Sequence, residues 1–271
     1  MHLRLALLFC LLLLSDAAVA HQTWALARNG GEGKVSIQLS HGTVFPVGDH
    51  PVSAEHLQSA WLLPAGRESG QSELQPSAAT ASYLPMEASA AGASWALATI
   101  SLKPGEIELD TASVEEYLRE LGDPEALRTA WSPGDRWRER FYKHAKALVR
   151  MGEGRADTEA MDAGMVLEFI PLQDPTRLRP GQPLDFRLEF HDQPLADHRV
   201  GMVYANSHGE VWTRTDANGL GRLVLAHPGW ALLHSVVISP SDEDSLDWES
   251  HFATLSFEIP HPEISENLGG D

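Results

Sequence analysis

Cysteine is nearly absent from this chain of 271 residues, which contains a single one, Cys10. That cysteine lies in the apolar run at the amino terminus, and residues 21–271 contain none. Disulfides, thiolate metal sites, iron–sulfur clusters and thiol catalysis are therefore excluded from this part of the sequence. A segment of roughly 250 residues is long enough to be stabilised by packing alone.

Basic side chains are also scarce. The sequence has 20 lysines and arginines against 38 aspartates and glutamates, which gives a formal net charge of −18. Binding to nucleic acid or to anionic lipid requires a basic surface, so we expect no nucleic-acid partner and no adsorption to anionic lipid. No segment after residue 20 is apolar enough to cross a membrane, so we also expect no direct membrane insertion. The acidity is compatible with cation binding but does not require it.

Long hydrophobic runs are confined to residues 1–20. Arg4 precedes an apolar run from Leu5 to Leu14, which is too short to span a bilayer. The sequence Ala18-Val19-Ala20 then has the small residues that signal peptidase recognises. We therefore expect a signal peptide that is cleaved after Ala20 and a periplasmic location. Cleavage removes one arginine and one aspartate, so the net charge is unchanged.

The first half of the remaining sequence has the pattern of β-strands. Hydrophobic residues make up 43% of the whole sequence and charged residues 21%, as in globular proteins. Between Lys34 and Ser40 apolar and polar residues alternate, which predicts a half-buried strand. Further strands are predicted at Leu57–Leu63, Trp95–Leu102 and Glu106–Asp110.

The pattern becomes helical after Thr111. Apolar residues recur at helical spacing at Val114, Tyr117, Leu118 and Leu121. Asp123 and Pro124 then predict the start of a second helix, with the aspartate as N-cap. A third helix that ends near Gly152 is predicted from the shared face of Trp137, Phe141, Ala145 and Leu148. We therefore expect helices over about residues 111–151, followed by a linker at Met151–Met161.

The last part of the sequence has the pattern of an all-β domain. The predicted strands are Val166–Leu172, Leu184–Phe190, Val200–Ala205, Val211–Thr215, Gly221–Ala226, Trp230–Ile238 and Phe252–Ile259. Seven short strands over about 95 residues are typical of an immunoglobulin-like sandwich. The sequence Asp216-Ala217-Asn218-Gly219 predicts a hairpin turn in which asparagine and glycine adopt positive φ.

Together these patterns predict a mainly β protein. After the signal peptide, residues 21–162 are predicted to form a β-sandwich-like domain with a helical insertion. Residues 163–260 are predicted to form an immunoglobulin-like β-sandwich, and residues 261–271 a disordered tail.

His21 is the first candidate metal ligand. Cleavage after Ala20 makes it the amino terminus, and its free amine and its ring Nδ1 can then chelate one metal ion. Amine and imidazole nitrogens suit Ni, Cu or Zn. The alternative interpretation is a terminal residue with no role.

His41 and His234 are the other two candidates. His41 follows the strand that begins at Lys34 and has the parity of its buried face, and His234 shares parity with the apolar residues of its own strand. A single histidine in such a position is more often hydrogen-bonded in the core than a ligand. His251 begins the last strand and is open to either reading. No H-E-x-x-H, C-x-x-C or H-x-H motif is present, so a site must be assembled from separate strands.

The sequence lacks several common catalytic and nucleotide-binding motifs. The sequence has no G-x-S-x-G elbow, no phosphate-binding loop and no G-x-G-x-x-G. Adjacent carboxylates are frequent, but at this acidity they are expected without function, and no glycosidase pair can be singled out.

Several landmarks, in order, resemble a known family. They include His21-Gln22-Thr23-Trp24, Leu39-Ser40-His41-Gly42, Arg138-Glu139-Arg140-Phe141, Leu167-Glu168-Phe169-Ile170-Pro171 and Asp247-Trp248-Glu249-Ser250. The sequence is similar over its whole mature length to a large bacterial family of exported proteins with a domain of unknown function. Some of its members are additional periplasmic components of energy-coupling-factor nickel transporters.

The resemblance implies a β-rich protein of two parts that handles nickel or a related divalent metal. It strengthens His21 as a ligand, and also His234, because the family commonly has a histidine on the matching strand. The turn at His41 varies more within the family.

We therefore expect a periplasmic metal-binding accessory protein, associated with metal uptake through a membrane transporter, with no catalytic role. One alternative is a copper-dependent oxidative enzyme in which His21 forms a histidine brace. Another is a non-catalytic interaction module in which the histidines are incidental.

Overall fold

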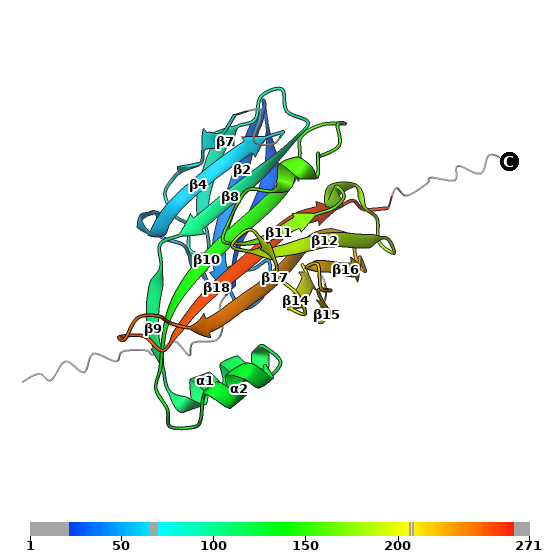
Figure 1. Cartoon of the computed structure of the whole chain (residues 1–271). Helices are drawn as coiled ribbons and strands as arrows, with labels where there is room; N and C mark the ends of the chain where they lie inside the picture. Colours follow the sequence, from blue (N-terminus) through cyan, green and yellow to red (C-terminus); the bar gives the residue numbers. More distant parts are fainter. Residues whose placement is uncertain (1–21, 66–69, 206, 208, 263–271) are drawn as a thin grey trace, which may run out of the picture.

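The computed structural model describes residues 22–65, 70–205, 207 and 209–262, which form three β-sheets and two α-helices (Figure 1). The prediction of a mainly β protein is thereby confirmed. The predicted signal peptide, His21 and residues 263–271 of the predicted tail lie outside the described residues. Within the described ranges, no helix is long and apolar enough to cross a membrane.

The largest sheet, here called the central sheet, has the strand order β15-β14-β17-β18-β10-β8-β4-β5, with β9 beside β10. Its strands are β4 (Leu57–Pro64), β5 (Ser72–Glu73), β8 (Trp95–Leu102), β9 (Gly105–Leu109), β10 (Trp137–Arg150), β14 (Arg199–Tyr204), β15 (Glu210–Arg214), β17 (Gly229–Pro240) and β18 (Trp248–Ile259).

Two smaller sheets pack against the central sheet. The first sheet contains β1 (Gln22–Gly31), β2 (Lys34–Gly42), β3 (His50–Pro51), β6 (Gln75–Pro76) and β7 (Leu84–Ser89). The third sheet contains β11 (Leu167–Pro171), β12 (Pro183–Phe190), β13 (Gln193–Pro194) and β16 (Leu220–Val224). The helices are α1 (Thr111–Glu120) and α2 (Glu125–Ala130), with short 3₁₀ turns at Ala54–His56, Glu159–Met161 and Pro175–Arg177.

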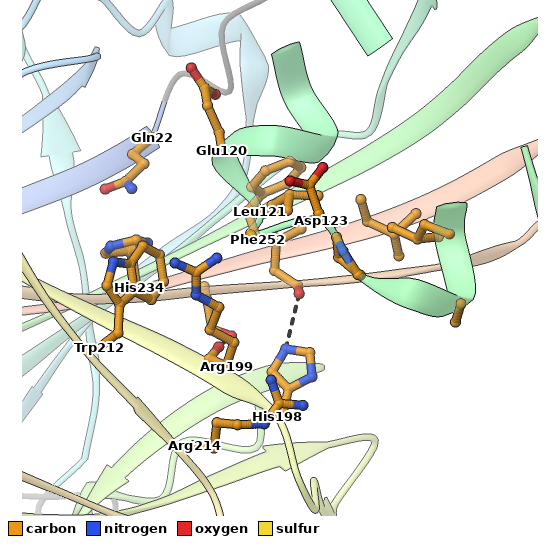
Figure 2. A pocket seen from close by; sticks show the side chains of 18 of the residues that line it. Gln22, Glu120, Leu121, Asp123, His198, Arg199, Trp212, Arg214, His234 and Phe252 are labelled. Atoms are coloured by element: carbon orange, nitrogen blue, oxygen red, sulfur yellow. Dashed lines mark hydrogen bonds between the residues drawn. The ribbon is translucent and has the colours of Figure 1, made fainter. Parts of the chain in front are cut away.

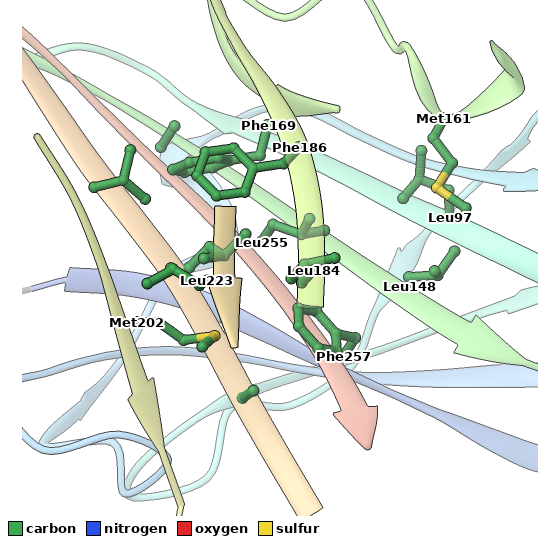
Figure 3. Packing of buried hydrophobic residues seen from close by; sticks show 14 of the residues in the cluster. Leu97, Leu148, Met161, Phe169, Leu184, Phe186, Met202, Leu223, Leu255 and Phe257 are labelled. Atoms are coloured by element: carbon green, nitrogen blue, oxygen red, sulfur yellow. The ribbon is translucent and has the colours of Figure 1, made fainter. Parts of the chain in front are cut away.

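The two smaller sheets cover opposite faces of the central sheet. Alternate residues of β10 point to the two sides, so Ala145 and Ala147 pack under the first sheet while Leu148 packs under the third. Small alanines on the first side allow close approach of the two sheets. Figure 3 shows the second side, where Phe169 and Phe186 of the third sheet pack over the central sheet.

The central sheet crosses the predicted domain boundary. β10 belongs to the first predicted domain and β18 to the second, yet they pair in parallel, with Ala145 opposite Thr254. On its other side β10 pairs antiparallel with β8. The boundary predicted between residues 162 and 163 therefore divides the chain but not the sheet.

The third predicted helix is wrong, because Trp137–Arg150 forms the 14-residue strand β10. This strand has neighbours on both edges and packing on both faces, so its apolar residues do not alternate with polar ones. The buried face toward the third sheet includes Lys146, which is paired with Glu168. This ion pair balances the charge of Lys146 inside the core.

The turn at Asp216–Gly219 also differs from the prediction. It joins β15 of the central sheet to β16 of the third sheet, so its flanking strands are not a paired hairpin. Gly219 has a φ of +71°, while Asn218 is not among the residues with positive φ. The glycine alone supplies the left-handed conformation, and the turn links two layers of the fold.

Both helices pack against the lower ends of β9, β10 and β18 in the view of Figure 1. Asp110 caps α1 by accepting a 2.8 Å hydrogen bond from the Ser113 backbone N–H. The apolar side of α1, including Tyr117, packs against Trp137 and Trp248, whose rings stack with centroids 4.8 Å apart. This packing fixes the connection between α1 and α2 beside the central sheet.

Candidate functional site

A pocket of about 1180 Å³ lies where the first sheet leaves the central sheet uncovered (Figure 2). Its walls come from the start of β1, from the connection between α1 and α2, and from β14, β15, β17 and β18. Segments from both ends of the chain therefore meet at this pocket.

The floor of the pocket is formed by a row of residues that lie directly opposite one another on the neighbouring strands β15, β14, β17 and β18. Trp212 on β15 lies opposite Gly201 on β14, Gly201 lies opposite His234 on β17, and His234 lies opposite Thr254 on β18. Residues directly opposite one another on neighbouring strands project to the same face of a sheet. The row therefore presents an indole, an imidazole and a hydroxyl to one side.

His234 is held by two neighbours on β15. Its Nε2 forms a hydrogen bond with Glu210 Oε1, and its ring lies edge-on to Trp212 with a centroid distance of 5.4 Å. A Cβ placed on Gly201 would lie 2.3 Å from both His234 Nε2 and Glu210 Oε1. Only glycine at this position leaves room for the imidazole–carboxylate pair.

The start of β1 is tied to the floor by hydroxyl groups of β18. Thr254 Oγ1 donates a 2.7 Å hydrogen bond to the backbone carbonyl of Thr23, and Ser256 Oγ donates to that of Ala25. Thr23 also lies opposite His41 in the first sheet, and its Oγ1 is 2.7 Å from His41 Nδ1. Gln22 is thereby placed on the pocket wall.

Acidic residues at the connection of the helices form the opposite rim. Glu120 ends α1, and Asp123 follows with a φ of +53°. The predicted N-cap of α2 is wrong, since Pro124 is the capping residue and Asp123 instead pairs with the Arg128 guanidinium. Arg128 also donates a 2.5 Å hydrogen bond to Glu115, which ties the two helices together.

His198 lines the pocket without offering a charge. Its Nε2 is 3.0 Å from the Val236 carbonyl, so this nitrogen carries the proton and donates it. Burial lowers the pKa of His198 below its ordinary value, and the hydrogen bond to the carbonyl opposes this only in part. The imidazole is therefore neutral at pH 7.

A second polar cluster lies on the opposite face of the central sheet. Ser101 Oγ is 3.1 Å from His144 Nδ1, His144 Nε2 is 3.4 Å from His251 Nδ1, and His251 Nε2 is 3.2 Å from Glu249 Oε1. Burial lowers the pKa of His144 to about 4. His144 lies in the stretch that was predicted as a third helix, and in the observed strand its side chain is buried.

The family model described as "Domain of unknown function (DUF4198)" matches residues 18–239. The chain belongs to the DUF4198 family. The matched range includes β1, both helices and most of β17, and so covers most of the pocket wall in this DUF4198 protein.

Other comparisons add little to this assignment. No curated protein matches the chain. Among solved structures, the D0-D1 domain of intimin is similar at 12% identity, with 88% of this chain and 98% of that chain covered. The TM-score is 0.23, so this likeness carries no argument about the arrangement of the DUF4198 chain.

The three predicted metal ligands lie in different places relative to the pocket. His234 lines the pocket. His41 is not a lining residue, but its Nδ1 lies 2.7 Å from the hydroxyl oxygen of Thr23, which does line the pocket. His21 is outside the described residues. Within the described ranges, no group of three or more His, Cys, Asp or Glu side chains is placed to hold a metal ion.

Sequence reasoning missed three other side chains that line the pocket, which are Arg199, Glu210 and Trp212. They lie on two separate strands and meet His234 only through the strand register. One signal was available, because the isolated Gly201 within a strand indicates close approach of other groups.

Proposed function

We propose that this DUF4198 protein is an exported, periplasmic accessory protein that binds nickel or a related divalent transition metal and passes it to a membrane transporter. The observation that carries the proposal is that Gln22, at the start of β1, and His234 line the same pocket. The pocket that contains His234, the candidate strand ligand, is therefore also lined by the residue that follows the candidate terminal ligand in sequence.

The position of Gln22 supports His21 as a ligand. Consecutive Cα atoms joined by a trans peptide bond are about 3.8 Å apart. The residue before Gln22 is therefore within reach of the pocket that Gln22 lines. Cleavage after Ala20 gives that residue a free amine beside its imidazole. Together with His234, this supplies three nitrogen donors of the kind that Ni, Cu and Zn prefer.

The pairing of His234 with Glu210 supports the same site. A metal ion bound to His234 Nε2 would take the place of the hydrogen bond between this nitrogen and Glu210. The carboxylate would then either bind the metal or orient the imidazole, as in the outer shell of many metal sites. Because the imidazoles must be neutral to bind, affinity is expected to fall as the pH is lowered through the histidine range.

His41 is the third proposed ligand. It lies behind Thr23 and does not itself line the pocket. Its Nδ1 faces the hydroxyl of Thr23, so a metal would have to bind its Nε2. The hydrogen bond then orients the ring from behind.

The first experiment is calorimetric titration of the mature protein, with His21 verified as its amino terminus, against Ni²⁺, Cu²⁺ and Zn²⁺. The matched control carries one extra residue ahead of His21, which removes the chelating amine. We expect the control to bind at least about 100-fold more weakly, and His234→Gln to lose about 10- to 100-fold in affinity. Equal affinity in mature and extended proteins would contradict the proposal.

A second assay separates metal handling from oxidative catalysis. The copper-loaded mature protein is incubated with ascorbate, and peroxide production and glycan oxidation are measured. Metal handling predicts no turnover above that of free copper, whereas sustained activity that requires His21 would favour a copper-dependent enzyme. Sequencing the amino terminus of the protein from a periplasmic fraction tests export and cleavage after Ala20.

A further inference from the structure

The pocket contains an arginine that is held in place without a carboxylate partner. Arg199 on β14 lies with its guanidinium carbon 3.5 Å from the centroid of the Trp212 ring. On its other side is Gly122, where a Cβ would lie 1.6 Å from Arg199 Nη1. The guanidinium is thus confined between an indole face and the backbone of the helical connection.

The two neighbouring arginines of the pocket region have different surroundings. Arg214 donates a 2.7 Å hydrogen bond to Asp197, and Arg128 pairs with Asp123 and Glu115. In the part of the chain that the structure describes, Arg199 has no such ion pair and its side-chain nitrogens have no protein acceptor. They are not among the buried unpaired nitrogens either, so they are open to the pocket (Figure 2).

An unpaired guanidinium is unexpected in a protein with a net charge of −18. Its five donors form a planar fork that matches a carboxylate, and stacking on an aromatic ring fixes the direction of that fork. Trp212 is 37% exposed, so its indole also offers an apolar surface beside the fork. These features favour an organic anion over a bare cation at this end of the pocket.

The remaining charges limit the type of anion. The helical rim carries Glu120 and Asp123, Glu210 is paired with His234, and Asp197 is paired with Arg214. A ligand whose carboxylate pairs with Arg199 therefore occupies a pocket that several carboxylates also line. This arrangement suits a small carboxylate that also carries an ammonium group or a bound metal ion. The volume of about 1180 Å³ is more than enough for such a molecule.

We propose that the pocket binds a small organic carboxylate that can chelate metal, with Arg199 as the residue that receives the carboxylate and Trp212 as the residue that holds Arg199 in position. This subsite goes beyond the proposed metal function. It is built from different side chains and does not require that His21 or His234 bind metal.

The test is calorimetric titration of the metal-free mature protein with citrate and, separately, with L-histidine. We expect L-histidine to bind at millimolar or lower concentration, because it carries both a carboxylate and an ammonium group, and citrate without metal to bind more weakly. Arg199→Gln is expected to weaken that binding about 10-fold or more, since it removes a charge-assisted pair. The control is Arg222→Gln, which changes an exposed arginine paired with Asp185 on the third sheet and is expected to bind like the unchanged protein.

The outcomes separate the two proposals. Ni²⁺ alone is titrated into the unchanged protein and into Arg199→Gln, and its affinity is expected to be the same in both. If neither citrate nor L-histidine binds, or if Arg199→Gln binds them equally well, the carboxylate subsite is overturned whatever Ni²⁺ does. If a carboxylate binds through Arg199 while Ni²⁺ alone does not bind, the subsite stands and the proposed metal function fails. Thermal melting of each variant checks that it is folded.

Discussion

The buried histidine His144 links single-residue chemistry to stability. Its side chain lies between Ser101 and His251, and it is only 7% exposed. Burial, with a smaller contribution from His251, lowers its pKa from 6.5 to about 4. The protein therefore folds around a neutral imidazole.

This shift predicts a loss of stability in mild acid. Above pH 6.5 the imidazole is neutral in both folded and unfolded chains, and the full contribution is present. As the pH falls from 6.5 to 4, the unfolded chain takes up the proton first, so the free energy of unfolding decreases. We expect His144 to account for about 2 kcal/mol between pH 7 and pH 4.5, measured by urea unfolding.

The matched variant for this prediction is His144→Gln, which keeps a partner for Ser101 but does not titrate. Its stability is expected to change less between pH 7 and pH 4.5 than that of the unchanged protein. The same slope in both proteins would show that other groups, such as carboxylates, are responsible.

At the residue level, the strand position of His234 was predicted correctly, whereas the residues that surround it in the pocket were not predicted. The parity of His234 with Trp230 and Leu232 placed it correctly on a strand, and the structure adds that it faces the pocket. Arg199 and Trp212 carried no such signal, because their proximity depends on strand register, which no local pattern encodes. A site assembled from separate strands is visible only once the strands are paired.

At the scale of elements, β10 shows how a buried charge is accommodated. Lys146 Nζ donates to the Met161 and Phe169 carbonyls at 2.7 and 2.8 Å, and it pairs with Glu168. Both side chains are 2% exposed. Glu168 also accepts hydrogen bonds from the backbone N–H groups of Ala163 and Met165. The pair thus anchors the segment that enters the third sheet.

Lys146→Met is expected to destabilise the protein by about 3–5 kcal/mol, because it leaves the Glu168 carboxylate buried without its partner. Urea unfolding at pH 7 measures the change. In the double variant Lys146→Met with Glu168→Leu, part of the loss is expected to return.

The matched control is again an exposed pair. Arg222→Gln breaks the contact with Asp185 at the surface of the third sheet, and it is expected to change stability far less than Lys146→Met does. A loss in Lys146→Met as small as in Arg222→Gln would contradict the assigned role of the buried pair.

Exposure of one face helped some strand predictions but was not required, since β8 was predicted over the observed range Trp95–Leu102 although nearly all of its residues are buried. β2 alternates between buried and more exposed residues, and its predicted range agrees with the structure to within two residues. β10 is covered on both faces, and its apolar spacing at Phe141, Ala145 and Leu148 coincides by chance with a helical repeat. β1, with a mixed sequence and glycines at its end, gave no strand pattern at all.

At the scale of the whole molecule, the shared central sheet makes the two predicted domains depend on each other. Without residues 163–262, β10 would lose its partner β18 and expose one open edge. Leu97 and Leu148 would also lose the third sheet that covers them.

We therefore expect the fragment 22–162 not to fold cooperatively, whereas the protein 22–262 unfolds in a single transition. Circular dichroism during thermal melting measures both. A sharp melting transition in the fragment would show that the first predicted domain is independent.

The contact between Thr254 and Thr23 joins positions 231 residues apart in sequence. The β1 strand is made first and β18 almost last, so a growing chain has no finished pocket until its final strand has been synthesised and threaded into place. A partly synthesised chain that lacks β18 therefore has neither the hydroxyl group that holds the start of β1 nor the part of the pocket wall that β18 supplies.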